Sequence, residues 1–279
     1  MQRSITRKSI NDYKQYLLMA EKAHATITKY INEVERLSEY LEHNALNKCA
    51  LLEYRETLAE NFSSRTVNTK LAAINGYLSF IGADEYKVQL LKVQRRAFID
   101  ESRELSAAEY KRLVNAADVG GNDRLSLVMQ TICATGIRIS ELSYITVDAV
   151  KERRMEIRLK GKSRTVIIPS KLCKKLVEYA RRQRIDTGAV FRTKGGKPLD
   201  RANVCHDMKR LCDAAHVERS KVFPHNLRHL FARAFYSIEK NLSHLADVLG
   251  HSSIETTRIY VAASSRQYER MLDKMKLIT

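Results

Sequence analysis

Apolar side chains recur at helical spacing through the first eighty positions of the chain. Spacing of three and four residues places such side chains on one face of a helix. The pattern predicts two amphipathic helices between Ser9 and Glu42, the second starting near Thr26 or Thr28, and a third helix over residues 46–58. The apolar positions of the first two helices are Ile10, Tyr13, Leu17 and Leu18, and then Ile27, Tyr30, Ile31, Val34, Leu37 and Leu41.

A fourth helix is predicted by the stretch SSRTVNTKLAAINGYLSFIG at 63–82. Ser63 or Ser64 is suited to cap its first turn, because a serine hydroxyl accepts a hydrogen bond from a free N–H there. Gly82 is expected to end the helix. The apolar stripe of this helix consists of Val67, Leu71, Ile74, Tyr77 and Leu78.

In residues 92–103 the helical spacing of apolar residues ends and charged residues become frequent. Directly after them, Ser106 and Glu109 stand three positions apart, as in a capping box at the start of a helix. We therefore expect an N-terminal helical domain over residues 1–95, a linker over 96–104 and a C-terminal domain over 105–279.

The C-terminal domain has helical patterns with one interruption. Between Met155 and Pro169, two runs of β-branched and aliphatic residues flank the polar KGKSR, which predicts a β-hairpin with its turn at 160–164. The fold class is thus mainly α, with a small β-sheet in the second domain. Helices are predicted over 107–117, 122–135, 170–183, 201–216, 225–238, 242–249, 253–261 and 265–275, with another starting near Ser140.

The composition is that of a folded protein outside the membrane, with 44% hydrophobic and 29% charged residues. No apolar run reaches the roughly 18 residues that span a bilayer, and the first ten residues do not resemble a signal peptide. We expect a cytoplasmic location. The five cysteines contain no CxxC pair, which argues against both a disulfide framework and a zinc site.

The charge of the chain indicates an anionic partner. The net charge is +17, of which +3 belongs to residues 1–103 and +14 to residues 104–279. Proteins that neutralise many phosphates need such an excess, whereas solubility alone does not. The second domain is therefore expected to bind nucleic acid.

Arg138 is the first candidate for phosphate chemistry. It follows an expected turn at Gly136 and stands at the start of a helix, where free backbone N–H groups favour an anion. Glu141, one turn later, is placed to orient the arginine. The alternative for the two residues is a surface ion pair, which typically contributes under about 1 kcal/mol.

His225, Arg228, His251 and Tyr260 lie in one C-terminal stretch. His225 and Arg228 stand at i and i+3, on one helix face, although His225 alone would also serve as a helix cap. Imidazoles exchange protons near neutral pH, and a guanidinium offers a fork to phosphate. A phenol, with its usual pKa of about 10, needs neighbouring cations to attack phosphorus. Other tyrosines, such as Tyr13, Tyr77 and Tyr179, are expected to pack in cores.

These groups together fit a metal-free transesterification. Two arginines would hold the phosphate oxygens, the tyrosine would attack phosphorus, and Lys160 or Lys162 would protonate the leaving oxygen. The sequence has no DxD or HExxH pattern, no Walker A motif and no dinucleotide-binding fingerprint. We expect no metal and no cofactor.

The order of these motifs resembles that of the tyrosine recombinases of the phage integrase family, close in layout to Xer-type recombinases and mobile-element integrases. The resemblance spans nearly the whole chain. It rests on ATGIRISEL, KGKSRTVIIP, HNLRH and LGHSSIETTRIY, preceded by the helix at 63–82. It implies a SAM-like core-binding domain, then a catalytic domain.

The resemblance also implies residue roles. Arg138 and Arg228 would bind the scissile phosphate, His225 would assist proton transfer, His251 would bond the phosphate, and Tyr260 would form a 3′-phosphotyrosyl link. The general acid would be Lys160, with Lys162 as its competitor because the turn is short. Further contacts to DNA are expected from Arg65, Thr66, Asn68, Lys70, Lys162 and Arg164, although those on the fourth helix also suit a solvated face.

The implied partners are double-stranded DNA and further copies of the chain. A homotetramer would act on paired sites through a Holliday junction, with accessory DNA-bending proteins as further candidates. The apolar positions Tyr268, Met271, Leu272 and Met275 suggest a tail that docks on a neighbouring copy. Two other functions remain open from the sequence, a type IB topoisomerase and a catalytically silent DNA-binding regulator.

Overall fold

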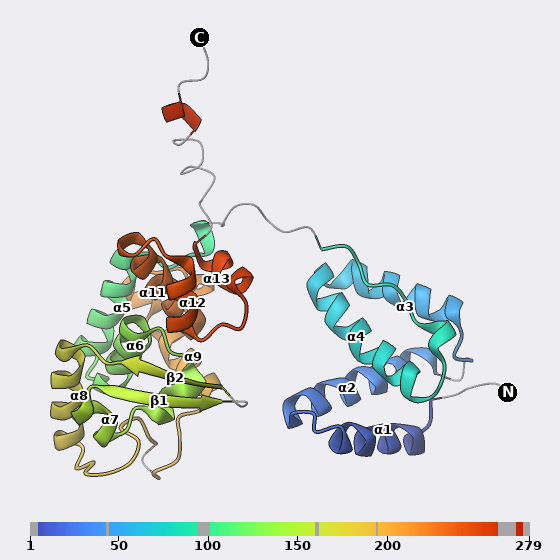
Figure 1. Ribbon diagram of the computed structural model, residues 1–279, viewed down its shortest axis with the longest axis horizontal. Coiled ribbons are helices and arrows are strands. Elements are labelled where there is room, and N and C mark those ends of the chain that lie inside the picture. The colour runs from blue at the N-terminus through green and yellow to red at the C-terminus, as the bar shows by residue number, and fades with distance from the viewer. Residues whose placement is uncertain are drawn as a thin grey trace. The chain divides into compact units, whose positions relative to one another are not determined.

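The computed structural model describes residues 5–42, 45–93, 101–159, 162–193, 195–261 and 272–275. The chain forms two compact units, Met1–Arg95 and Arg96–Thr279 (Figure 1). Both are built mainly of α-helices, and the named strands of the described residues form a single antiparallel pair. None of the helices in these ranges combines the length and hydropathy needed to span a bilayer.

The N-terminal unit is a helical bundle. Helix α4 packs against α2 and α3, and α1 packs against α2. Tyr13 and Tyr77 are buried between these helices, as the sequence predicts. Its elements are α1 (Arg7–Met19), α2 (His24–Leu41), α3 (Lys48–Asn61), α4 (Ser64–Phe80) and the 3₁₀ turn η1 (Asp84–Tyr86).

The predicted helix starts of this unit are confirmed. Ser63 caps α4 by accepting a hydrogen bond from the Thr66 N–H. Helix α2 begins at His24, two residues before Thr26, after an Ala23 N-cap that has no side-chain acceptor. The Thr28 hydroxyl donates to the His24 carbonyl inside the first turns.

The second unit consists of helices packed against a β-hairpin that lies at one side of the unit (Figure 1). The predicted capping box of Ser106 and Glu109 is present at the start of α5. The elements before the hairpin are η2 (Glu101–Arg103), α5 (Ala107–Val119), α6 (Asp123–Thr135), η3 (Ile139–Tyr144) and α7 (Val147–Glu152). The hairpin and the elements after it are β1 (Arg154–Leu159), β2 (Lys162–Ile167), α8 (Ser170–Arg182), α9 (Arg201–Arg210), α10 (Cys212–Ala215), η4 (Arg219–Lys221), α11 (Pro224–Ile238), α12 (Leu242–Leu249) and α13 (Ile254–Val261).

Two local predictions for this unit were wrong. The segment near Ser140 is the 3₁₀ turn η3 rather than an α-helix, because it soon meets Thr146, whose hydroxyl caps α7. The hairpin turn is also shorter than predicted. Leu159 pairs with Lys162 in the sheet, so Lys162 and Arg164 belong to strand β2.

Several elements meet where the candidate residues lie. Helix α11 packs against α6, α12 and α13, and α12 also packs against strand β2. The polypeptide leaves α6 through Gly136, which has φ +66° and ends that helix. A Cβ at Gly136 would lie 2.4 Å from the ring of Phe231 and 3.1 Å from Leu249 Cδ2. This glycine therefore allows α6, α11 and α12 to approach one another closely.

Replacement of Gly136 by alanine is expected to destabilise the second unit by about 3 kcal/mol, since it adds left-handed strain to overpacking. Gly121 is the matched control, because its φ is +68° and nothing lies within 4 Å of an added Cβ. Gly121→Ala should cost about 1 kcal/mol from the backbone alone. Urea denaturation of both variants measures the difference, and equal losses would contradict the packing argument.

Candidate active site

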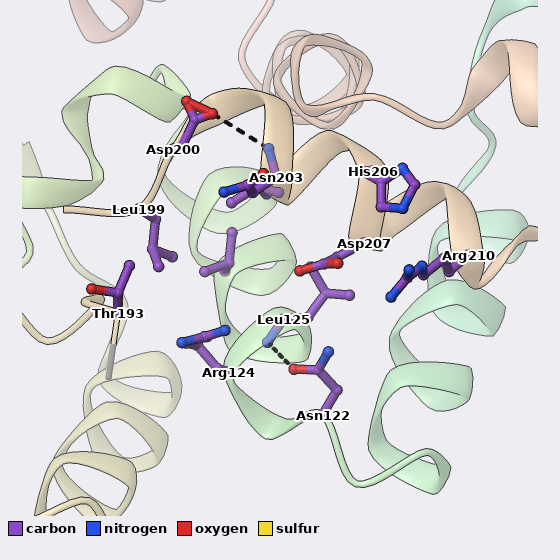
Figure 2. Close-up of a pocket in the computed structure, with 12 residues that line it drawn as sticks. Asn122, Arg124, Leu125, Thr193, Leu199, Asp200, Asn203, His206, Asp207 and Arg210 are labelled. Carbon is purple, nitrogen blue, oxygen red and sulfur yellow. Dashed lines mark hydrogen bonds between the residues drawn. The ribbon is translucent and has the colours of Figure 1, made fainter. Parts of the chain in front are cut away.

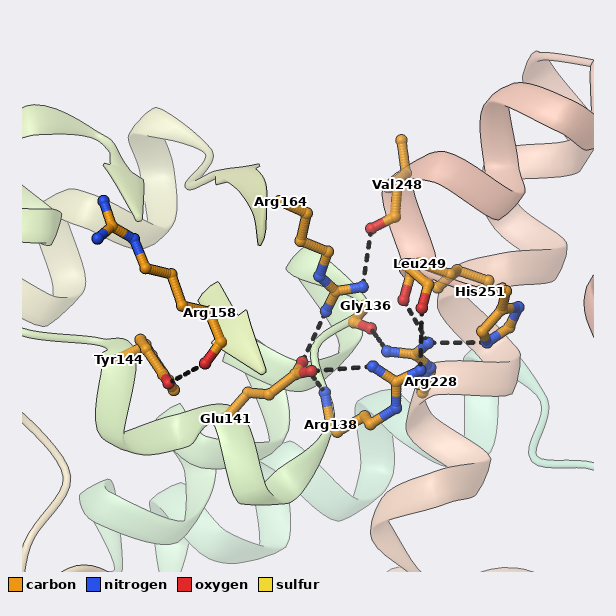
Figure 3. Close-up of polar contacts among 11 residues, drawn as sticks. Gly136, Arg138, Glu141, Tyr144, Arg158, Arg164, Arg228, Val248, Leu249 and His251 are labelled. Atoms are coloured by element: carbon orange, nitrogen blue, oxygen red, sulfur yellow. Dashed lines mark hydrogen bonds and ion pairs between the residues drawn. The ribbon is translucent and has the colours of Figure 1, made fainter. Parts of the chain in front are cut away.

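Glu141 is the buried carboxylate around which the site is organised. Its Oε1 accepts a hydrogen bond from Arg138 Nη1 at 2.9 Å, and its Oε2 accepts from the Arg138 N–H at 2.7 Å (Figure 3). Arg164 Nη2 donates to the same Oε2 at 2.6 Å. The expected pairing of Arg138 with Glu141 is confirmed, and Arg164 joins it from strand β2.

Arg164 also connects the hairpin to the end of α12. Its Nη1 donates to the Val248 carbonyl at 3.2 Å, and its side chain fills the space beside Gly250, where a Cβ would lie 2.6 Å from Nη1. Burial lowers the pKa of Arg164, with the Arg138 charge acting in the same direction and Glu141 opposing it. Arg164 is therefore committed to the protein interior in this structure.

Arg228 is the most deeply buried cation of the site, with only 1% of its surface exposed. Its Nη1 donates to the Gly136 carbonyl at 2.6 Å, and its Nη2 donates to the Leu249 carbonyl at 2.7 Å (Figure 3). Burial, and then the charge of Arg138, lower the pKa of Arg228 to about 10, so it is still charged at neutral pH. Its Nε is buried and has no hydrogen-bond partner among the described residues.

The hydrogen bonds of His251 define its tautomer. Nε2 lies 2.9 Å from Arg228 Nη2, and because a guanidinium only donates, Nε2 accepts. Nδ1 then carries the hydrogen and donates to Thr257 Oγ1 at 2.9 Å. Burial, and then the charges of Arg228 and Arg138, lower the pKa of His251 to about 4. His251 is thus neutral at pH 7.

Tyr260 lies beside His225. The hydroxyl of Tyr260 is 3.2 Å from His225 Nε2, and only 5% of the tyrosine is exposed. Burial, followed by His229 and Arg228, lowers the pKa of His225 to about 4, so its imidazole is neutral and able to accept a proton. The alternative of a helix cap for His225 is wrong, since the N-cap of α11 is Phe223 and no side chain caps it.

The structure therefore brings together Arg138, His225, Arg228, His251 and Tyr260. The two candidates for the general acid are not part of this described cluster, because Lys160 and the side chain of Lys162 lie outside the described residues.

The remaining DNA-contact candidates lie in varied positions. Arg65 and Thr66 are exposed at the start of α4. Lys70 is only 7% exposed, and its ammonium forms an ion pair with Glu33 at 2.7 Å. The Asn68 amide bonds both the N–H and the carbonyl of Leu91. The polar groups of Lys70, Asn68 and Arg164 are bound within their own unit in this structure, and their contacts with DNA stay predictions.

Sequence reasoning missed His229, which contacts Tyr260, and Glu104, which contacts His229. The ring of His229 is 4.4 Å from the Tyr260 ring, and its Nδ1 is 3.2 Å from Glu104 Oε1. His229 stands four positions after His225, so one helical turn places both on one face. The spacing of four residues between His225 and His229 could therefore have identified His229 from the sequence. Glu104 fell within the predicted linker, and no sequence pattern pointed to it.

A separate pocket of ≈ 350 Å³ lies between α6, α9 and the loop before α9 (Figure 2). It shares no residue with the cluster around Tyr260. Some of its polar groups already form hydrogen bonds within the chain, since Asp200 caps α9 and Arg124 Nη1 donates to the Arg192 carbonyl.

Comparison with known proteins identifies the chain as a tyrosine recombinase, an enzyme that cleaves and rejoins DNA. Residues 103–267 match the phage integrase family, and residues 10–85 match the phage integrase N-terminal SAM-like domain. The chain belongs to the phage integrase family. This confirms the resemblance that its motifs carry.

Relatives of similar length support the assignment. The chain is 30% identical to the tyrosine recombinase XerA of Thermococcus kodakarensis, over 96% of this chain and 95% of that protein. It is 25% identical to XerA of Pyrococcus furiosus, over 99% and 97%.

Solved structures share the fold at low identity. One is the XerH site-specific recombinase bound to difH substrate in a pre-cleavage complex, with a TM-score of 0.71 and 19% identity over 98% of this chain and 86% of that one. Another is a lambda integrase dimer bound to a COC′ core site, with a TM-score of 0.73 and 15% identity over 93% and 78%.

Proposed function

We propose that Tyr260 is the nucleophile of a site-specific recombination reaction on double-stranded DNA. The observation that carries this proposal is the contact between the Tyr260 hydroxyl and a neutral His225 Nε2 beside the buried Arg228. A neutral imidazole is able to accept the phenol proton, and the nearby guanidinium favours the negative charge that develops.

The proposed cleavage exchanges one phosphodiester for another. Tyr260 Oη forms a bond to phosphorus as its proton passes to His225 Nε2, and the bond from phosphorus to the 5′ oxygen breaks. The product is a 3′-phosphotyrosyl link and a free 5′ hydroxyl, which takes its proton from Lys160 or Lys162. The reverse steps with a second DNA end rejoin the strand, so no ATP is consumed.

Arg138 and Arg228 would hold the nonbridging oxygens. Support comes from two features of the DNA-free chain. Arg138 is partly exposed, with 40% of its side chain accessible, and the buried Nε–H of Arg228 has no partner in the part of the chain that the structure describes. A buried donor without an acceptor is costly, and a phosphate oxygen would satisfy it.

His251 would change its protonation state when DNA binds. In the free chain its Nε2 accepts from Arg228, so it has no hydrogen there to offer a phosphate. An anion nearby raises the pKa of an imidazole. We propose that the scissile phosphate takes the Arg228 contact and that His251, once protonated at Nε2, donates to the phosphate.

The assembly that we propose is a homotetramer on two DNA sites, with residues 1–95 as a core-binding domain and residues 105–279 as the catalytic domain. One matching structure is a lambda integrase tetramer bound to a Holliday junction. We also propose accessory DNA-bending proteins as partners of this assembly, and a cytoplasmic location for the protein. Leu272 and Met275 of the tail are exposed, while Tyr268 and Met271 lie outside the described residues.

A nicked suicide substrate tests the proposed reaction. Loss of the short fragment that carries the 5′ hydroxyl should trap a covalent protein–DNA adduct, visible by denaturing electrophoresis. Failure to form an adduct on any duplex would favour a silent DNA-binding regulator. Adducts on single duplexes combined with relaxation of supercoils, and without exchange between two sites, would favour a topoisomerase.

DNA affinity is expected to fall steeply with salt. A protein that contacts six or more phosphates loses roughly 10³-fold or more in affinity between 50 and 200 mM salt, because counterions are released on binding. The +14 net charge of residues 104–279 predicts such a slope. Fluorescence anisotropy over a salt series measures it, and a flat response would contradict phosphate binding by this surface.

A further inference from the structure

The segment that opens the second unit is fastened to helix α11. Asn226 Nδ2 donates to the Arg103 carbonyl at 2.9 Å, and Arg233 Nη2 donates to the Leu105 carbonyl at 2.5 Å. Glu104, between them, directs its side chain to the same helix. Residues 103–105 are thus attached to α11, the helix that carries His225 and Arg228.

The Glu104 carboxylate lies between His229 and Arg233. Its Oε1 is 3.2 Å from His229 Nδ1, its Oε2 forms an ion pair with Arg233 Nη1 at 3.3 Å, and its side chain is 12% exposed. Burial acts to raise the pKa of Glu104, but the contacts with His229 and Arg233 outweigh it, so the net shift is downward. The ionised carboxylate accepts from Nδ1–H, which fixes the orientation of the His229 ring.

His229 lies between this carboxylate and the nucleophile. Its ring meets the Tyr260 ring edge-on, at a centroid distance of 4.4 Å and an angle of 70°. It also meets the His225 ring at 4.8 Å and 64°. Tyr260 additionally stacks on His251 at 5.2 Å and 27°. Three imidazoles therefore border the phenol ring, and among the described contacts it is the His229 ring that is held by a carboxylate.

We propose that His229, oriented by Glu104, is a positioning residue that holds the Tyr260 ring so that its hydroxyl meets His225 Nε2. This inference rests on the proposed role of Tyr260 as the nucleophile. Transfer to phosphorus depends on the alignment of the attacking oxygen, and a displacement of about 1 Å can cost roughly 10²-fold in rate. A ring held by a fixed neighbour keeps that alignment without contacting DNA.

A purely structural role predicts different behaviour. Asn226 and the contact of Arg233 with Leu105 fasten the same segment without touching Tyr260. If fastening were the only role of His229, loss of Asn226 and loss of His229 would have the same consequences. Asn226→Ala is therefore the matched control, because it removes hydrogen bonds to the Arg103 and Lys221 carbonyls and leaves the ring contacts intact.

The experiment measures single-turnover cleavage of a nicked suicide substrate by the full chain at saturating protein, alongside DNA affinity and melting temperature. We expect His229→Ala to slow cleavage by about 10- to 100-fold, with DNA affinity unchanged within about twofold. Glu104→Ala should slow it by about tenfold, whereas Glu104→Gln, which still accepts from Nδ1–H, should stay within about threefold of the parent. Asn226→Ala should lower the melting temperature. At temperatures below that melting temperature, its cleavage rate should equal that of the parent.

The double variant Glu104→Ala/His229→Ala gives a sharper criterion. Since Glu104 acts through His229, the double variant should cleave no more slowly than His229→Ala alone. Additive losses, or a parental rate in His229→Ala, would overturn the inference. If His229→Ala does not fold, Glu104→Ala and Glu104→Gln still decide it by their difference.

The two proposals fail in distinguishable ways. A parent protein that forms no covalent adduct contradicts the role of Tyr260. A parent that forms the adduct, together with a His229→Ala variant that forms it equally fast, contradicts only the positioning role.

Discussion

Replacement of Tyr260 by phenylalanine is expected to abolish the covalent adduct with a nicked suicide substrate. The phenyl ring keeps its contacts with His229 and His251, and only the hydroxyl beside His225 Nε2 is lost. Removal of a nucleophile typically lowers the rate by roughly 10⁴-fold or more. Denaturing electrophoresis should show no shifted band, while a mobility-shift assay should show DNA affinity unchanged within about twofold.

Tyr236 offers the matched control for this variant. It also packs in the cluster formed by α11, α12 and α13, but its ring lies beneath the Lys240 ammonium at 5.3 Å, and none of the ring contacts among the described residues joins it to the imidazoles around Tyr260. Tyr236→Phe should form the adduct at the parental rate. Adduct formation by Tyr260→Phe would show that another residue is the nucleophile, and would contradict the proposed reaction.

The second large effect is expected from Arg228→Lys. The planar guanidinium donates to two carbonyls and to His251 at once, and a single ammonium cannot reproduce this fork. We expect cleavage to slow by about 10³-fold, as for the loss of other preorganised charge donors. Leaving a buried carbonyl unsatisfied should also reduce stability by about 2 kcal/mol.

The kinetics must be separated from folding in this case. Cleavage is measured below the melting temperature of the variant and at saturating protein, so that neither unfolding nor weak binding limits the rate. Arg158→Lys is the control, because Arg158 is 78% exposed and its ion pair among the described residues is with Glu156. A loss of less than tenfold in Arg228→Lys would argue against direct phosphate binding.

Much of the fold could be predicted because local patterns decide it. The apolar stripe and the Ser63 cap of α4, and the capping box of α5, depend on residues within one or two turns. The start of α2 was predicted only to within two residues. Its N-cap is Ala23, whose side chain accepts no hydrogen bond, so no capping residue marks His24 as the first position.

The hairpin shows how a distant contact overrides composition. KGKSR contains residues typical of a turn, yet Lys162 to Arg164 belong to β2. The side chain of Arg164 explains its place in a strand, since it reaches Glu141 and the Val248 carbonyl. Neither partner is near it in sequence.

The sequence predicted which residues form the candidate site, but not the hydrogen bonds that join them. Motif spacing identified Arg138, His225, Arg228, His251 and Tyr260. That Arg228 donates to the carbonyl of Gly136, 92 positions earlier, is a property of the packing of α11 on α6. Glu104 could not be found at all, because its relevance depends on the tertiary position of His229.

The carboxylate shared by Arg138 and Arg164 determines the net charge of the cluster. In the DNA-free chain, three guanidinium groups contribute three positive charges and Glu141 removes one, while His225 and His251 are neutral, which leaves two. A phosphodiester carries one negative charge, and the phosphorane that forms on attack by a phenolate carries two. The proton that passes to His225 during attack would add a positive charge as the second negative charge develops, so the cluster would favour the pentacoordinate state over the intact and the phosphotyrosyl DNA. Because both ends of the reaction are monoanions, this matching favours neither cleavage nor rejoining.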